Sequence, residues 1–131
     1  MTEEEFCLGL VERVRQIYTD NNQHMARVEW LQKHLPISLT GHQPTLTHGE
    51  LQKKNIIITR THLQNGDDED GFELTILDWE DAGWYPDYFE YFACYTSFRW
   101  DNDWPQIVEV FLDPYPVETL VLMPVYHDIF M

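Results

Sequence analysis

The chain has 131 residues, of which 44% are apolar and 15% aromatic, so it is long enough for one domain with a real hydrophobic core. Its formal net charge of -15 argues against nucleic acid or an anionic membrane as a partner, because phosphate groups are bound by clustered cations. No apolar run approaches the roughly 20 residues of a membrane span.

The N-terminal third predicts two helices. Residues 2–20 place apolar side chains at helical spacing, and Thr2 and Glu5 form a capping-box pattern at the start. A second helix is expected at about 22–35, where Pro36 ends it. The acidic first residues have the wrong sign for a secretory signal, and two cysteines do not make a disulfide framework. We therefore expect a soluble, cytoplasmic protein.

The rest of the chain predicts a hairpin followed by helices. A buried strand is expected at 56–59, a polar tip at 66–71 and a returning strand at 72–77. Helices are expected at about 87–98 and 104–112. The apolar tail, 114–131, contains three prolines and fits no single pattern, but it must pack on its own domain or on a neighbour.

Two segments about thirty residues apart carry side chains that can do chemistry. The first has the form H-x-E-x-x-x-x-N, with His48, Glu50 and Asn55, and runs into three isoleucines. The second places Asp78 at the end of the returning strand. Phosphoryl transfer uses a carboxylate to accept the hydroxyl proton and an asparagine and an aspartate to hold metal. A strand–loop–strand hairpin would bring Glu50, Asn55 and Asp78 together.

The match to a known family extends beyond these residues. The matching runs are Thr47-His48-Gly49-Glu50-Leu51, Asn55-Ile56-Ile57 and Leu77-Asp78-Trp79-Glu80-Asp81-Ala82-Gly83-Trp84-Tyr85-Pro86-Asp87-Tyr88-Phe89-Glu90-Tyr91. They resemble fungal members of the aminoglycoside phosphotransferase family. The resemblance covers about residues 45–95. It implies an α+β fold, a mostly helical kinase-like C-terminal lobe with a small β-hairpin, as a single domain over 1–131.

The resemblance also implies site residues. The candidate catalytic residues are Glu50, Asp78, His48 and Glu80. Asn55 and Asp78 are the metal candidates if Mg²⁺ binds, which is the only cofactor that we consider. The expected substrate pocket is lined by Trp79, Asp81, Trp84 and Tyr85. For His48, support of the loop through hydrogen bonds and acid–base work both remain open, and for Glu80 so do catalysis and a salt bridge or helix cap.

Two departures from the family pattern bear on activity. Glu50 stands where the family has aspartate, and one extra methylene moves the carboxylate by roughly 1 Å, a displacement that can cost about 10²-fold in rate. Nothing before His48 resembles a phosphate-covering glycine loop or a strand lysine, so the nucleotide lobe is not represented. The chain is either a fragment or a C-lobe-only protein; Met1 beside a helix cap favours the second.

Three functions follow as alternatives. The chain is a repurposed enzyme that uses its carboxylates for acid–base chemistry on a small molecule, in secondary metabolism. Alternatively, it is one part of a Mg-ATP phosphotransferase whose nucleotide lobe is missing or supplied in trans. The third alternative is a non-catalytic binding or scaffold protein. We expect a small-molecule substrate, no nucleic-acid or membrane partner, and a homodimer that covers apolar surface on the hairpin side or the tail.

Overall fold

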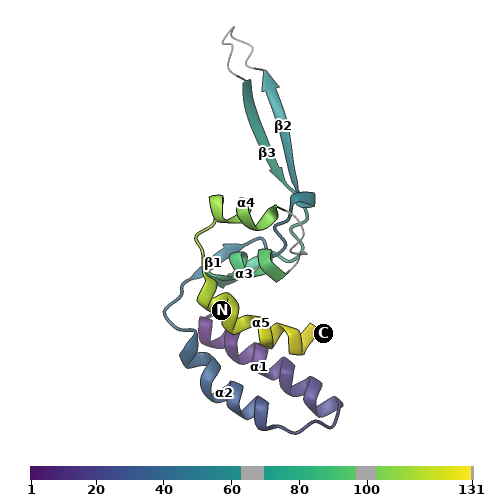
Figure 1. Cartoon of the computed structure of the whole chain (residues 1–131), viewed down its shortest axis with the longest axis vertical. Coiled ribbons are helices and arrows are strands. Elements are labelled where there is room, and N and C mark those ends of the chain that lie inside the picture. The colour runs from purple at the N-terminus through teal and green to yellow at the C-terminus, as the bar shows by residue number, and fades with distance from the viewer. Residues whose placement is uncertain (63–69, 97–102, 131) are drawn as a thin grey trace.

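The computed structural model describes residues 1–62, 70–96 and 103–130, and within them the chain folds as an α+β protein (Figure 1). Helices gather at one end of the molecule, and a two-stranded antiparallel hairpin projects from the other end (Figure 1). The α+β class predicted from the sequence is confirmed. In the described ranges, none of the helices combines the length and the apolar character that a bilayer crossing requires.

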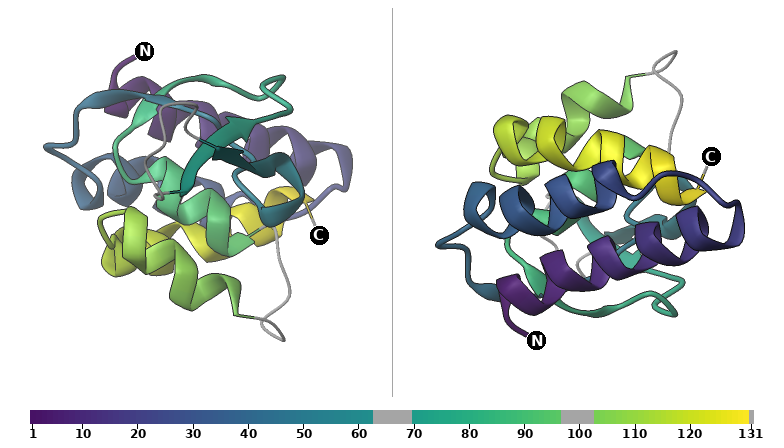
Figure 2. Two further views of the ribbon diagram at one scale, coloured as in Figure 1. Left: turned by 90° about the horizontal axis from the view of Figure 1, so that it is seen from above. Right: turned by 90° about the horizontal axis from the view of Figure 1, so that it is seen from below.

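The first two helices pack side by side (Figure 2). Helix α1, Glu3–Asp20, begins with the predicted capping box, in which the Thr2 hydroxyl accepts from the Glu5 amide (3.1 Å) and the Glu5 carboxylate accepts from the Thr2 amide (2.8 Å). Helix α2, Ala26–Ser38, starts later than predicted and runs through Pro36, so the predicted stop is wrong. Pro36 lies in the last turn, where the hydrogen bond that its missing amide cannot make is one of the last in the helix. The Leu39 amide then closes the helix by donating to the Leu35 carbonyl oxygen.

The remaining helices complete the helical end. They are α3, Phe89–Thr96, α4, Trp104–Phe111, and α5, Pro116–Phe130. The tail that the sequence left unassigned is therefore mostly helix α5, and it packs against α1 and α3 rather than standing free (Figure 2). Its Leu122 and Val125 enter the same core as Phe92 and Val14.

Two short strands pair across the candidate site. Strand β1, Pro44–Thr47, is antiparallel to β4, Gly83–Pro86, in the register Thr45↔Tyr85. Neither strand was predicted, because four residues are too few to show a period of two. A one-turn 3₁₀ helix, Lys53–Asn55, then leads into the hairpin.

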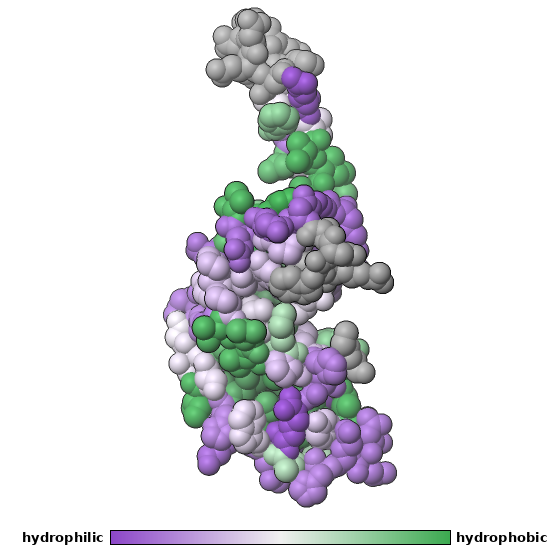
Figure 3. Space-filling view, in the orientation of Figure 1, coloured by the Kyte–Doolittle hydropathy of each residue, from purple (hydrophilic) through white to green (hydrophobic). Residues whose placement is uncertain are grey.

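The hairpin pairs β2, Ile56–His62, with β3, Asp70–Ile76. Both strands were predicted, but the predicted burial of the first is wrong, since Ile58 is 64% exposed. Among the described residues the strand pairs with β3 alone, and the hairpin projects away from the helical end (Figure 1). Apolar residues gather near the base of the hairpin on the face shown in Figure 3. Most of the predicted tip, 66–71, lies outside the described residues.

Candidate functional site

His48 joins the two segments that the sequence singled out. Its imidazole is buried, with Nε2 donating to the Leu77 carbonyl oxygen (2.8 Å) and Nδ1 accepting from the Glu50 amide (3.2 Å). These partners define a neutral ring that carries its proton on Nε2. The Trp79 ring meets it edge-on, with 4.7 Å between centroids. Both ring nitrogens are thus occupied by backbone groups, an arrangement that holds the loop in place.

Glu90 anchors the same loop from helix α3. Its carboxylate accepts from the His48 amide (2.6 Å) and from the Gly49 amide (3.1 Å). Charge-assisted bonds of this kind are among the stronger hydrogen bonds in proteins. Sequence reasoning assigned Glu90 no role, although an acidic residue in the first turn of the helix just after the second segment was a visible signal.

Gly49 brings the second segment against the first. Its φ is +88°, and a Cβ built there would lie 2.9 Å from the Asp81 carbonyl oxygen. A larger residue would meet both the strained backbone and that contact. Asp81 therefore lies directly against the loop that carries Glu50.

Asn55 ties Glu50 to the segment of Asp78. The Asn55 side chain is 6% exposed, and its Nδ2 donates to the Glu50 carbonyl oxygen (2.8 Å). The backbone carbonyl oxygen of Asn55 accepts a hydrogen bond from the amide of Leu77 (2.7 Å), the residue just before Asp78. Asp78 follows with a φ of +61°, which turns the chain out of the strand, and its side chain is exposed. The bonds thus bring the backbones that carry Glu50, Asn55 and Asp78 next to one another.

The Glu50 carboxylate is half-buried and lies beside a cationic side chain. Lys54 Nζ lies 3.3 Å from Glu50 Oε1, four residues along the chain, and is itself largely exposed. An exposed pair of this type is worth about 0–1 kcal/mol, so it orients the carboxylate more than it stabilises the fold.

The donor atoms of Asn55 and Asp78 suit magnesium in kind. An amide oxygen and a carboxylate are hard oxygen ligands, and Mg²⁺ usually takes one or two protein oxygens together with phosphate and water. In the part of the chain that the structure describes, no group of three or more His, Cys, Asp or Glu side chains is placed to hold a metal ion. Any metal at Asn55 and Asp78 would therefore rely on ligands from a bound phosphate compound.

The predicted substrate-pocket residues divide into two sets. Asp81 and Tyr85 line a groove of about 650 Å³ together with Gly49 and residues of α1 and α5. Tyr85 stacks on Phe89 with 4.4 Å between ring centroids. Trp79 and Trp84 do not line this groove and are 51% and 60% exposed.

Glu80 is exposed, between Asp78 and Asp81. It occupies an exposed turn that the Ala82 amide closes on the Trp79 carbonyl oxygen (3.0 Å). The turn leads into strand β4 and not into a helix, so Glu80 does not serve as a helix cap.

The comparisons with known proteins bear on the same region. Residues 8–118 match the phosphotransferase enzyme family, and the match spans both the His48 loop and the Asp78 segment. No curated protein and no solved structure gave a significant match. The match covers most of the chain and coincides with the bonded network around His48, Asn55 and Glu90, and the chain therefore belongs to the phosphotransferase enzyme family.

Proposed function

We propose that this chain carries the proton-accepting and metal-binding half of a Mg-ATP-dependent phosphotransferase that acts on a hydroxyl group of a small molecule. The observation that carries the proposal is a pair of hydrogen bonds made by Asn55. Its side chain donates to the Glu50 carbonyl oxygen, and its backbone carbonyl oxygen accepts from the Leu77 amide. These bonds bring together the two segments that bear Glu50, Asn55 and Asp78. Family membership supports the same reaction class.

Each of the three residues has a distinct role in the proposal. The Glu50 carboxylate accepts the proton of the substrate hydroxyl as its oxygen attacks phosphorus. Lys54 engages Oε1, so we assign the proton to Oε2. Asn55 and Asp78 would hold Mg²⁺, whose charge offsets that of the phosphates. Glu90 and His48 keep the loop in position through their backbone bonds.

The groove beside Gly49 and Asp81 is the place that we propose for the substrate. Its volume of about 650 Å³ lies within the range of about 300–1,000 Å³ that is typical of small-molecule sites. Aromatic side chains form part of its wall, while Glu5, Asp81 and Arg13 supply charge. A compound with an apolar body and several hydroxyl or amino groups fits this mixture.

The proposed metal site at Asn55 and Asp78 can be tested without catalytic turnover. We would titrate the chain with Mn²⁺ and tripolyphosphate and follow paramagnetic broadening in ¹H–¹⁵N spectra. Broadening should centre on Asn55 and Asp78, and Asp78→Asn should weaken it at least about tenfold, since a metal held by few protein oxygens depends strongly on each. Glu73→Gln, on the exposed hairpin, is the matched control. Equal broadening in the parent protein and in Asp78→Asn would refute the proposed metal site.

Catalysis is tested separately with a mixture of small alcohols and amino sugars and with γ-labelled ATP at millimolar concentration, so that weak ATP binding by the chain alone does not prevent transfer. Glu50→Gln and Asp78→Asn should each lower transfer at least about 10²-fold while the fold is retained, as expected for positioned proton-transfer and metal-binding groups. Near-normal transfer in both variants would place the active site elsewhere.

A second candidate function is favoured by Glu50 itself. The longer side chain and its contact with Lys54 suit a repurposed enzyme that moves protons without ATP, including one in secondary metabolism. Calorimetry with Mg-ATP on this chain tests the ATP-free enzyme. We expect weak binding or none by the chain alone, because nothing before His48 resembles a phosphate-covering loop or a strand lysine, and a micromolar dissociation constant would argue against the ATP-free enzyme.

A further inference from the structure

His42 joins two helices that are far apart in the sequence, α1 and α5. Its Nδ1 lies 2.6 Å from Glu3 Oε2, in the first turn of α1, and its Nε2 lies 3.3 Å from Glu118 Oε1, in the first turn of α5. The backbone amide of His42 also donates to Glu3 Oε1 (3.0 Å). The side chains of His42, Glu3 and Glu118 are 16%, 9% and 19% exposed. None of them has a role in the proposed reaction, so an inference about them does not depend on it.

The two contacts indicate which form of the ring fits this position. An ionised carboxylate only accepts hydrogen bonds, and a neutral imidazole donates from one nitrogen, whereas an imidazolium donates from both. The arrangement around His42 therefore fits the imidazolium. The contact with Glu3 is the shorter one and is supported by the backbone amide, so a ring that loses one proton should keep the other on Nδ1. Its Nε2 would then present a lone pair to the Glu118 carboxylate, and two acceptors that face each other repel.

Two tyrosine rings pack against His42. Tyr88 meets the imidazole edge-on with 4.7 Å between centroids, and Tyr115 does so at 6.2 Å. Burial raises the pKa of both tyrosines, and it raises the pKa of Cys7, beside Tyr88, to about 12, so these three groups stay protonated near neutral pH. Two further carboxyl groups lie near the Tyr115 side chain, those of Asp87 and Asp113. Histidine is the side chain whose ordinary titration falls between about pH 5 and 8, so the ring is the group to follow in this range.

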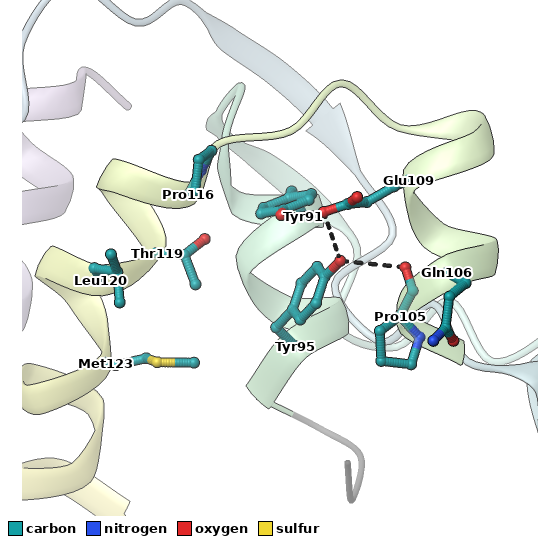
Figure 4. A pocket seen from close by; sticks show the side chains of 9 residues that line it. All are labelled: Tyr91, Tyr95, Pro105, Gln106, Glu109, Pro116, Thr119, Leu120 and Met123. Carbon is teal, nitrogen blue, oxygen red and sulfur yellow. Dashed lines mark hydrogen bonds between the residues drawn. The ribbon is translucent and has the colours of Figure 1, made fainter. Parts of the chain in front are cut away.

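The first turn of α5 is less firmly packed than the rest of the helix. Val117 and Leu120 are 66% and 68% exposed. A cavity of about 430 Å³ borders this end of the helix at Pro116 and Thr119, on the side that faces α3 and α4 (Figure 4). Farther along the helix, Leu122 is completely buried in the core. A segment with few buried contacts can open while the core stays intact, so the carboxylate contact is an important restraint on this turn.

We propose that His42 is a proton-dependent latch, which holds the first turn of α5 through Glu118 and is itself anchored to α1 by Glu3. The imidazolium donates to both carboxylates and keeps the latch closed. As the pH rises and Nε2 loses its proton, the bond to Glu118 is replaced by repulsion, and the first turn of α5 opens locally. The core around Leu122 stays packed, so the opening does not unfold the domain.

Amide hydrogen exchange on the full chain tests the latch. The reporter is the Thr119 amide, which donates to the Tyr115 carbonyl oxygen (3.0 Å) at the start of α5. Its protection factor, which is corrected for the intrinsic acceleration of exchange with pH, should fall about tenfold between about pH 5 and 8, as expected for the loss of a hydrogen bond between charged groups. The protection of Val125, farther along the same helix, should not change. Constant protection of Thr119, or an equal fall at Val125, would overturn the proposal.

Three variants complete the test. Glu118→Gln offers Nε2 both an acceptor and a donor, so it can bond to the ring in either protonation state and should make the protection of Thr119 independent of pH. His42→Gln removes the titrating group and should abolish the pH dependence as well. His127→Gln makes the same exchange at an exposed position in the last turn of α5 and should behave like the parent protein. If His42→Gln does not fold, Glu118→Gln decides. A fall in protection that persists in the folded variants at 42 or 118 would assign the effect to another group and contradict the latch.

Discussion

The helical end and the hairpin both carry large apolar side chains, but the helical end buries them and the hairpin exposes them. Phe92 and Leu122 are completely buried between helices, whereas Phe72 and Leu74 on the hairpin are 71% and 64% exposed. The helices lie in layers that cover one another, and the hairpin has only two strands with no second layer among the described residues (Figure 1). An apolar side chain is buried only if the fold supplies a surface to bury it against.

The register of the hairpin makes this difference sharper. Directly opposed residues of two antiparallel strands share a face, and Ile58 lies opposite Leu74, as Ile56 does opposite Ile76. Phe72 precedes Leu74 by two residues and therefore lies on the same side of the hairpin. These residues form one apolar hairpin face: Ile56, Ile58, Phe72, Leu74 and Ile76. A two-stranded hairpin alone is marginally stable in water, so such a face calls for cover.

The largest expected effect separates the two regions directly. Phe92→Ala should lower the free energy of unfolding by about 3–5 kcal/mol, because it removes a fully buried ring that packs on Phe89 and Tyr126. In the monomer, at low protein concentration, Phe72→Ala should cost about 0.5 kcal/mol or less. Urea denaturation followed by circular dichroism measures both. Similar losses would mean that the hairpin is as well covered as the helical core.

The loop between the two regions should show an intermediate effect. Glu90→Gln replaces one acceptor oxygen by an NH₂ group that faces a backbone amide of His48 or Gly49. We expect a loss of about 1–3 kcal/mol, together with faster amide hydrogen exchange at these two residues. Glu73→Gln is the control for the lost charge. Exchange rates that match the parent protein would show that the loop does not depend on Glu90.

We expect another surface to bury the apolar hairpin face in solution. We propose that a second copy of this chain provides it, since burying apolar area returns roughly 25 cal/mol per Å² and a symmetric dimer is the commonest closed assembly. The double variant Ile58→Thr and Leu74→Thr should shift sedimentation from a dimer to the 15.7 kDa monomer. Val117→Thr, on the exposed side of α5, should leave the dimer intact. A parent protein that sediments as a monomer at high micromolar concentration would contradict the proposal.

The effect that is smallest near neutral pH concerns two buried thiols of the helical end. Burial raises the pKa of Cys7 and of Cys94 to about 12 from an ordinary value of 9.0. Between these values the unfolded chain loses thiol protons that the folded chain retains, so the free energy of unfolding should fall as the pH rises from about 9 towards 12. Below pH 9 the thiols contribute no pH dependence.

Thiol labelling checks the same assignment near neutral pH. Both cysteines are free and buried, and the thiolate is the reactive form. At pH 8, Ellman's reagent should react with the native protein much more slowly than with the protein in urea. Rapid labelling of the native protein would show that the helical end opens readily, and it would weaken the contrast with the hairpin.

Local chemistry in the sequence determined much of the helical end. The capping box of Thr2 and Glu5 and the apolar spacing of helix α1 depend on residues three or four apart, and both were predicted correctly. The H-x-E-x-x-x-x-N motif, Asp78 and the strands between them were also visible, because the hairpin is a short-range unit. These features indicated which segments would meet.

Tertiary structure decided the rest, for a common physical reason. The pairing of β1 with β4, the bonds from Glu90 to the His48 loop and the helical tail all join residues about 40 or more positions apart or depend on packing partners. The isoleucine run from Ile56 predicts a strand, yet whether that strand is buried depends on a second layer, which no local pattern encodes. A sequence fixes the preference of a side chain for burial, but only the fold determines whether a surface is there to receive it.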